Sequence, residues 1–226
     1  MKTAVVLHGW ASNPAHWSQV IKGLKDNGFK VLKPDLPGFT VPISKPYNTQ
    51  DYVDWLKNYL RGKGKVVLIG QSFGGQIAIQ FTAQNPLMVE RLVLIGSAGI
   101  RRELNLKKQI FWLLAKMGKI LTASPLAKKI LYKLAREWDY AKASPLMKET
   151  LRLIVKDDQQ TNLRKVLTPT LLLWGSRDRY TPINQGQLMH RLIKGSTLKV
   201  FDGEGHGLHF TRATDLVKAI TEFTHG

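Results

Sequence analysis

The stretch LIGQSFGGQIAIQF, from Leu68 to Phe81, sets a serine among glycines where a short apolar run gives way to a helix-like run. Its centre, Gly-Gln-Ser-Phe-Gly at 70–74, matches the Gly-x-Ser-x-Gly turn that exposes a serine hydroxyl above a sheet. Side chains two residues to either side would collide in so sharp a turn, which explains the glycines. The turn also puts Ser72 at a helix N-terminus, where free N–H groups favour a developing negative charge. The stretch therefore predicts that Ser72 is a nucleophile rather than a plain turn residue.

Short apolar runs alternate with amphipathic segments along most of the chain. Strands that alternate with helices indicate a parallel sheet covered by helices on both faces. The near-continuous apolar strands fit burial on both sides. The sequence therefore predicts an α/β fold with a six-stranded, mostly parallel sheet flanked by helices. Strands are expected at 3–7, 30–33, 66–69, 92–95, 170–174 and 198–201, and helices at 15–27, 49–60, 74–84, 183–192 and 211–223.

Residues 101–163 interrupt this alternation and carry only helical patterns. Ser-Pro pairs at 124–125 and 144–145 suit helix starts, because proline is favoured at the first helical position. We expect residues 1–100 and 164–226 to form one core domain. The segment between them is expected to be an all-helical insertion.

The chain is strongly basic, with a net charge of +18 at neutral pH. Between Arg101 and Lys165, 16 Lys and Arg residues stand against six Asp and Glu residues, so this segment holds more than half of the net charge. Such a field attracts an acidic protein, nucleic acid or an anionic membrane. A solvated helical surface rich in lysine is the alternative. No nucleic-acid-binding motif accompanies the charge, so nucleic acid is not expected as a partner.

Three reactive side chains follow predicted strands at the carboxyl edge of the sheet, where open parallel sheets form their sites. Ser72 follows the third strand, Asp178 in GSRDRYTP follows the fifth, and His206 in DGEGHGLHF follows the sixth. A serine hydroxyl is a poor nucleophile unless a base takes its proton and an acid orients the base. The chain order Ser, Asp, His accompanies this type of turn. We predict Ser72 as nucleophile, His206 as base and Asp178 as the orienting acid.

Neighbouring residues compete for two of these roles. His209 and His8 are the alternatives to His206 as the base. Asp202 and Glu204 are the alternative acids, but they lie too near His206 on the same loop to orient it comfortably. We expect His8 to hold its loop rather than to act in catalysis.

Acyl transfer also needs N–H donors for the oxyanion. The backbone N–H of Phe73, directly after the nucleophile, is one predicted donor, and that of Trp10, after His8-Gly9, is the other. No cofactor or metal is expected for this chemistry. The chain has no cysteine, which excludes disulfides, thiolate catalysis and Cys-ligated metals, and it has no Gly-rich phosphate loop.

Five motifs, VVLHGWASNPAHW, DLPGF, GQSFGG, LLLWGSRDRYTP and GEGHGLHF, together resemble the α/β-hydrolase fold family in order and over nearly the whole chain. The HGW opening and the serine are most similar to carboxylesterases of the pimeloyl-acyl-carrier-protein methyl ester esterase type. Those esterases carry a four-helix cap where residues 101–163 stand, so the resemblance implies that this segment is a cap. The family usually has a strand hairpin before the His-Gly strand; the chain starts two residues ahead of that strand, so we expect six strands, all parallel. Gln71 stands where the family more often has histidine, which we expect to leave the mechanism intact.

The resemblance and the predicted triad together indicate a serine carboxylic ester hydrolase that forms an acyl-enzyme on small to medium apolar esters. The aromatic residues Phe111, Trp112 and Trp138 are candidate pocket walls, and their helical spacing fits the core of the cap equally well. C–C bond hydrolase, thioesterase, lipase and cofactor-free perhydrolase activities stay open in the same architecture. A different class of function is a basic cap that docks an acidic partner, such as acyl carrier protein, or an anionic surface.

No apolar run approaches the length that spans a bilayer; IFWLLA at 110–115 is one of the longest. The N-terminal MKTAVVLHGW is too short for a signal-peptide core and lacks a following cleavage pattern. We therefore expect a cytoplasmic protein.

Overall fold

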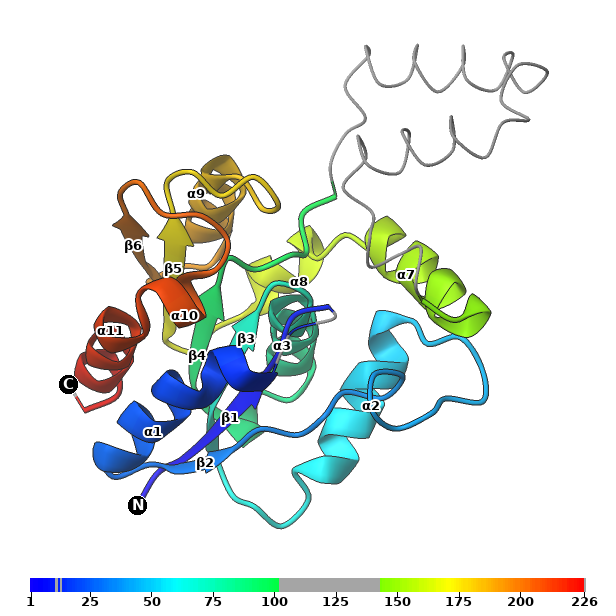
Figure 1. Ribbon diagram of the computed structural model, residues 1–226, viewed down its shortest axis with the longest axis horizontal. Coiled ribbons are helices and arrows are strands. Elements are labelled where there is room, and N and C mark those ends of the chain that lie inside the picture. The colour runs from blue at the N-terminus through cyan, green and yellow to red at the C-terminus, as the bar shows by residue number, and fades with distance from the viewer. Residues whose placement is uncertain (11, 13, 102–142, 226) are drawn as a thin grey trace.

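The structure is a computed structural model in which residues 1–10, 12, 14–101 and 143–225 are described (Figure 1). Within these ranges six strands form one sheet, in the order β2-β1-β3-β4-β5-β6, and every neighbouring pair is parallel. The six-stranded parallel sheet predicted from the sequence is therefore confirmed. The strands are β1 (Thr3–Leu7), β2 (Lys30–Leu32), β3 (Val66–Gln71), β4 (Val89–Ile95), β5 (Thr170–Gly175) and β6 (Thr197–Phe201).

Helices cover both faces of this sheet (Figure 1). One face carries α1 (Ser18–Asp26), α10 (Leu208–Thr211) and α11 (Ala213–His225); the other carries α2 (Thr49–Tyr59), α3 (Phe73–Gln84), α7 (Pro145–Lys156), α8 (Gln160–Lys165) and α9 (Ile183–Leu192). The helix predicted over 211–223 corresponds to α11, which begins two residues later and is preceded by the short α10, with Arg212 between them. None of the described helices is long and apolar enough to cross a membrane.

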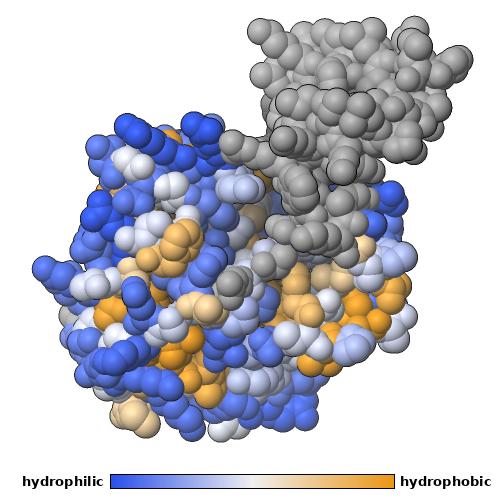
Figure 2. Space-filling view, in the orientation of Figure 1, coloured by the Kyte–Doolittle hydropathy of each residue, from blue (hydrophilic) through white to orange (hydrophobic). Residues whose placement is uncertain are grey.

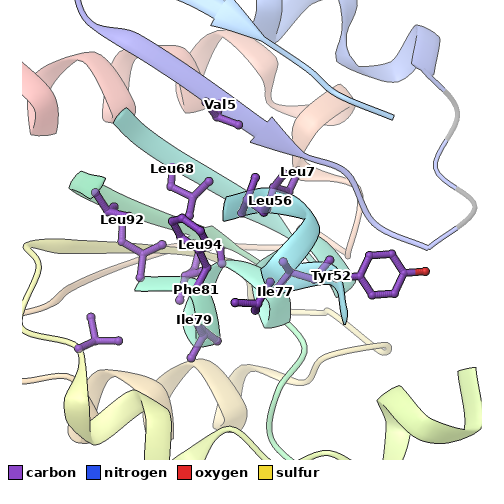
Figure 3. Packing of buried hydrophobic residues seen from close by; sticks show 14 of the residues in the cluster. Val5, Leu7, Tyr52, Leu56, Leu68, Ile77, Ile79, Phe81, Leu92 and Leu94 are labelled. Carbon is purple, nitrogen blue, oxygen red and sulfur yellow. The ribbon is translucent and has the colours of Figure 1, made fainter. Parts of the chain in front are cut away.

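The sheet separates two apolar clusters. Successive side chains of a strand point to opposite faces, so Leu68 of β3 packs towards α3 while its neighbour Ile69 packs towards α1 and α11. Figure 3 shows the first cluster, in which Ile77 and Phe81 of α3 lie against the strands. Each of these side chains is fully buried, and burial of an apolar side chain of this size contributes about 1.5–3 kcal/mol. The packing on both faces fixes the central strands and therefore the loops at their carboxyl ends.

Local sequence signals set the starts of two helices that border the site. Asn48 accepts a hydrogen bond from the backbone N–H of Asp51 at 3.0 Å, and the Asp51 carboxylate accepts from Asn48 N at 2.9 Å, which is a capping box for α2. Ser144 caps α7 through the N–H of Met147. Pro145 follows at the first helical position, where its missing N–H costs nothing. The predicted helix start at 144–145 is therefore confirmed, while the pair at 124–125 lies outside the described residues.

The described end of the predicted insertion packs on the core helices. Thr150 of α7 is fully buried, and its hydroxyl accepts a hydrogen bond from the backbone N–H of Tyr47 at 2.9 Å. The buried amide of Gln76, on α3, donates to the carbonyl oxygen of Ile154 at 3.0 Å. After α7, the N–H of Gln159 donates to Gly99 O at 2.7 Å, which joins the two ends of the insertion. These bonds place α7 beside the carboxyl edge of the sheet.

Candidate active site

The turn at Ser72 joins β3 to α3. Ser72 has φ 52° and ψ −116°, and it is the one non-glycine residue with a positive φ in the described part of the chain. Backbone of this kind costs about 1–3 kcal/mol and persists only where its surroundings hold it. Ser72 N donates to Ile95 O at 3.1 Å, and Ser72 O accepts from Ala98 N at 2.9 Å. The end of β4 and the following loop therefore hold the serine, which is partly exposed, at the carboxyl edge of the sheet.

Close backbone contacts explain the glycines around this turn. A Cβ on Gly70 would lie 2.6 Å from the backbone of α3, and a Cβ on Gly74 would overlap the carbonyl group of Leu7. A Cβ on Gly9, in the loop after β1, would lie 3.2 Å from Cβ of Ser72. Glycine at these positions therefore lets β1, β3 and α3 converge on the predicted nucleophile.

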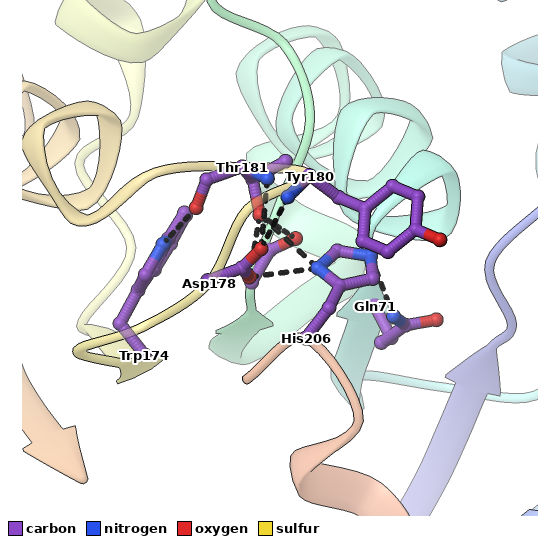
Figure 4. A network of polar contacts seen from close by, with 7 residues as sticks. Gln71, Trp174, Asp178, Tyr180, Thr181 and His206 are labelled. Atoms are coloured by element: carbon purple, nitrogen blue, oxygen red, sulfur yellow. Dashed lines mark hydrogen bonds and ion pairs between the residues drawn. The ribbon is translucent and has the colours of Figure 1, made fainter. Parts of the chain in front are cut away.

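The predicted base and acid are in direct contact (Figure 4). Nδ1 of His206 lies 2.7 Å from Oδ2 of Asp178. The Asp178 side chain is completely shielded from solvent, while 18% of the His206 side chain is exposed. A carboxylate can only accept hydrogen bonds, so Nδ1 carries the proton of a neutral imidazole and Nε2 has a free lone pair. The ring is thus in the tautomer that a general base requires.

The Asp178 carboxylate stays ionised in spite of its burial. Burial alone would raise the pKa of Asp178, but its hydrogen bond and charge interaction with His206 lower it, as do hydrogen bonds from Thr181, and the pKa lies below its ordinary value. Oδ1 accepts from the backbone N–H groups of Tyr180 at 2.8 Å and Thr181 at 2.9 Å. These donors hold the carboxylate with its other oxygen towards the imidazole.

Two residues that the sequence did not indicate shape this pair. The Thr181 hydroxyl is buried and lies 2.9 Å from Oδ2 of Asp178, 3.0 Å from Gly96 O and 3.3 Å from Nδ1 of His206. Gly96 follows β4 with φ 47°, and a Cβ there would lie 3.1 Å from Oδ2 of Asp178 and 3.3 Å from Nδ1 of His206. A side chain at Gly96 would therefore press on both members of the pair. In the sequence, the Thr-Pro pair that comes shortly after Asp178 is the feature that could have drawn attention to Thr181.

The remaining nitrogen of His206 faces the turn. Nε2 of His206 lies 3.2 Å from the side-chain amide nitrogen of Gln71, the residue directly before Ser72 (Figure 4). In the described residues no hydrogen bond joins the Ser72 hydroxyl to His206. The structure thus brings His206 and Asp178 into contact and places the predicted base beside the turn that carries the serine, with Gln71 paired to its Nε2.

The two residues with predicted oxyanion N–H groups are neighbours. The Trp10 ring lies edge-on to the Phe73 ring, with 5.7 Å between centroids, and edge-on to Phe39 at 5.0 Å. Phe73 is the first residue of α3, where backbone N–H groups have no partner within the helix. The loop after β1 therefore lies against the start of α3, as an oxyanion site requires.

His8 holds the loop that carries Trp10. Its Nδ1 pairs with Gly9 O at 2.8 Å, and its Nε2 accepts from the backbone N–H of Leu36 at 3.3 Å. Burial lowers the pKa of His8, so the ring stays neutral and keeps both hydrogen bonds. A cavity of about 300 Å³ lies beside this loop and is lined by His8, Ser12, Pro14, Lys33, Asp35, Phe39 and Thr40.

The competing residues bond elsewhere. His209 is buried and stacks on Trp17 at 4.7 Å, and burial, followed by the charges of nearby histidines, lowers its pKa to about 4. Glu204 pairs with Arg212 Nε at 2.8 Å, and Asp202 accepts a hydrogen bond from a serine hydroxyl after β5 at 3.0 Å. His209 bonds no acid among the described residues.

The surface around the site has a mixed character. Most of the face in Figure 2 is hydrophilic, and its apolar side chains form separate groups. Tyr180 is 58% exposed, and its ring lies 5.1 Å from that of His206, so it borders the approach to His206. No group of three or more His, Asp or Glu side chains in the described residues is arranged to hold a metal ion. The predicted pocket residues Phe111, Trp112 and Trp138 lie outside the described residues.

The sequence and the fold were compared with those of known proteins, and both have relatives. A family model described as "Alpha/beta hydrolase family" matches residues 4–219. A 2-hydroxy-6-oxo-2,4-heptadienoate hydrolase of Pseudomonas putida is 27% identical, over 97% of this chain and 87% of that protein. A pimeloyl-[acyl-carrier protein] methyl ester esterase of Neisseria meningitidis is 23% identical, over 100% of this chain and 94% of that protein. Among solved structures, an esterase from Exiguobacterium antarcticum has a TM-score of 0.79 at 20% identity, covering 100% of this chain and 92% of that chain, which shows a shared fold.

Proposed function

The chain belongs to the alpha/beta hydrolase family, and from this premise we propose that it is a serine carboxylesterase acting on small to medium apolar esters. The observation that supports this most is the 2.7 Å contact between the Asp178 carboxylate and Nδ1 of His206, beside a serine held in a strained strand-to-helix turn. A serine hydroxyl becomes a nucleophile when such a pair removes its proton.

In the proposed reaction, Ser72 Oγ attacks the ester carbonyl carbon while its proton passes to Nε2 of His206. Asp178 stabilises the imidazolium that forms but does not itself take the proton. The tetrahedral oxyanion accepts hydrogen bonds from the N–H groups of Phe73 and Trp10, and each such donor contributes about 10²–10³ in rate. The C–O bond then breaks, and the alcohol leaves with the proton from Nε2. Water, activated by the same nitrogen, releases the acid from Ser72.

The aromatic surroundings favour an apolar acyl or alcohol group. Trp10, Phe39 and Phe73 pack together next to the turn, and they offer apolar surface to a bound group. We propose Phe111, Trp112 and Trp138, in the segment predicted to be a cap, as candidates for further pocket walls.

A carrier protein is the proposed partner of the basic segment 101–165. A relative that matches along the whole chain is an esterase whose name specifies an acyl-carrier-protein ester. The excess of Lys and Arg in this segment would attract an acidic carrier. Hydrolysis of a carrier-bound ester would then weaken as salt rises, whereas that of a free ester would not.

C–C bond hydrolysis is the second candidate, because the Pseudomonas putida relative, a 2-hydroxy-6-oxo-2,4-heptadienoate hydrolase, aligns with 97% of this chain. The same Ser, His and Asp would serve that reaction. The two candidate functions differ in the substrate that is cleaved, so the first assay includes both an ester and a C–C hydrolase substrate.

The test is hydrolysis of p-nitrophenyl acetate, butyrate and octanoate by the wild type, Ser72→Ala and the control Ser18→Ala, an exposed serine of α1. Wild type and S18A should hydrolyse the esters and react with a fluorophosphonate, and S72A should do neither. Equal activity in S72A would refute the proposed nucleophile. Activity on 2-hydroxy-6-oxo-2,4-heptadienoate alone would select the second candidate.

A further inference from the structure

Gln71 occupies the space between the proposed base and the loop after β1. It is the last residue of β3, and only 3% of it is exposed. Its amide nitrogen lies 3.2 Å from Nε2 of His206 (Figure 4). On the other side, its Oε1 and Cδ lie against Gly9, where a Cβ would overlap the Oε1. The carboxamide is therefore confined by packing and points at the nitrogen that has to accept the proton of Ser72.

The direction of this hydrogen bond follows from the other side of the ring. Nδ1 of His206 lies 2.7 Å from an ionised carboxylate, so Nδ1 carries the proton and Nε2 is an acceptor. A carboxamide offers donors on nitrogen and an acceptor on oxygen. The amide N–H of Gln71 therefore donates to Nε2, and this bond exists only while the imidazole is neutral.

We propose that Gln71 is a positioning residue for His206: its amide holds Nε2 towards Ser72 and keeps the ring in its base form until a substrate brings the Ser72 hydroxyl to that atom. During attack, the Ser72 proton moves to Nε2, and the Gln71 amide keeps its own protons and gives up the bond. This inference rests on the proposed function, which it deepens by naming how the free enzyme is held ready.

The charged and titratable groups around His206 are Asp178, Tyr180 and His209, from the loop after β5 and from α10. The Thr181 hydroxyl also lies 3.3 Å from Nδ1. A substitution at Gln71 removes none of these groups. A shift in the pH profile of a Gln71 variant therefore reports the bond at Nε2.

The first variant is Gln71→Met, which keeps the length of the side chain and removes its donor. Without this donor the neutral imidazole of His206 is less stable relative to the imidazolium, so the ring stays protonated up to a higher pH. The acid limb of kcat/KM should move up by roughly 0.5–1 pH unit, the size expected for one hydrogen bond. The loss at the plateau should fall mainly on kcat, because the bond acts on the base rather than on the bound ester.

The second variant, Gln71→Glu, keeps the shape but offers only acceptors. A carboxylate next to Nε2 stabilises the imidazolium, so the acid limb should move further in the same direction than in Q71M. The matched control is Gln76→Met. Gln76 is also 3% exposed, and its amide donates to Thr49 Oγ1 at 3.1 Å and Ile154 O at 3.0 Å, away from His206. Q76M should lower stability without moving the acid limb.

The profiles are measured with p-nitrophenyl butyrate, and the His206 ring is titrated separately by ¹H–¹⁵N NMR, with its signal assigned by its loss in His206→Ala. An acid limb and a ring titration that stay in place in Q71M and Q71E would overturn the proposal. If Q71M does not fold, as judged by circular dichroism, Q71E carries the test. A wild type that hydrolyses no ester would count against the proposed function, while the NMR titration would still decide whether Gln71 controls His206.

Discussion

The Asp178 carboxylate is fully withdrawn from solvent and lies 2.7 Å from Nδ1 of His206, whose ring is partly exposed. The buried negative charge of Asp178 therefore lies in contact with a ring that solvent can reach. Its carboxylate is held by backbone N–H groups of the loop after β5, and its imidazole comes from the loop after β6. The distance between these two atoms depends on two neighbouring strands, so the sheet itself sets the geometry of the proposed base.

Asp178→Asn should abolish most of the ester hydrolysis. An asparagine can donate to Nδ1, which favours the tautomer with the proton on Nε2 and removes the acceptor for the Ser72 proton. A fall in kcat of about 10⁴ is expected, by analogy with the same change in other triads. The control is Asp202→Asn, which alters the competing acid and should leave kcat near the wild-type value. The reverse pattern, with D202N inactive and D178N active, would show that the acid has been misassigned.

Thr181→Val should lower both the stability of the fold and the kcat of the proposed reaction. The variant keeps the shape of the side chain but leaves Oδ2 of Asp178 and the carbonyl oxygen of Gly96 without this hydroxyl. A lost buried hydrogen bond of this kind costs about 1–3 kcal/mol of unfolding free energy. Urea unfolding measures that loss, and kcat at neutral pH should fall by about 10-fold, the rate equivalent of roughly 1.4 kcal/mol. Thr181→Ser retains the hydroxyl and should recover most of kcat, whereas a purely steric role for Thr181 would leave T181S as impaired as T181V.

Gly96→Ala should push His206 and Asp178 apart. The added Cβ would lie 3.1 Å from Oδ2 of Asp178 and 3.3 Å from Nδ1 of His206, in backbone with φ 47°. The left-handed backbone costs about 1–2 kcal/mol for a residue with a Cβ, and a misplacement near 1 Å lowers the rate by about 10².

Gly195→Ala separates the two effects of the change at Gly96. Gly195 has φ 72°, and a Cβ there meets nothing within 4 Å. G195A should therefore lose a similar amount of stability, measured by thermal unfolding, and keep its kcat/KM. Equal activity in G96A and G195A would show that Gly96 matters only for the backbone.

The sequence predicted the sheet because its strands are short apolar runs of buried β-branched and leucine residues. Val66–Ile69 and Leu92–Ile95 appear in β3 and β4 with small extensions, and the observed sheet is wholly parallel, as expected. With right-handed strand–helix–strand connections, the reversal of the strand order at β1 places helices on both faces of the sheet. The candidate triad could be proposed from the same strands, because Ser72 comes directly after β3 and the other two members lie in the loops that follow β5 and β6.

Contacts that depend on side-chain direction could not be predicted. The pattern at positions 70–74 identifies the turn, but it does not say that Gln71 reaches the ring of His206, which lies 135 residues further along the chain. In the same way, the pattern of Pro145–Lys156 predicts an amphipathic helix, but it does not indicate which element that helix packs against. Its packing on α3 depends on the buried amide of Gln76, a residue that looks like ordinary helix surface in the sequence.

His209 makes the stability of the fold depend on pH. Burial lowers its pKa to about 4, against an ordinary value of 6.5, so the unfolded chain binds a proton more readily than the folded protein between these values. Stability is therefore lost as the pH falls through this window, by about 2 kcal/mol between about pH 7 and about pH 5 from this residue alone. Other groups also titrate in this range, so the prediction is made for the part of the pH dependence that disappears when His209 is replaced.

His209→Phe should remove this part of the slope. The imidazole stacks on Trp17, and its Nδ1 has no hydrogen-bond partner among the described residues, so a phenyl ring can keep the stacking without a buried polar atom. The difference in urea midpoint between about pH 7 and about pH 5 should be smaller in H209F than in the wild type. A slope that is unchanged in H209F would mean that the buried ring does not resist protonation in the folded protein.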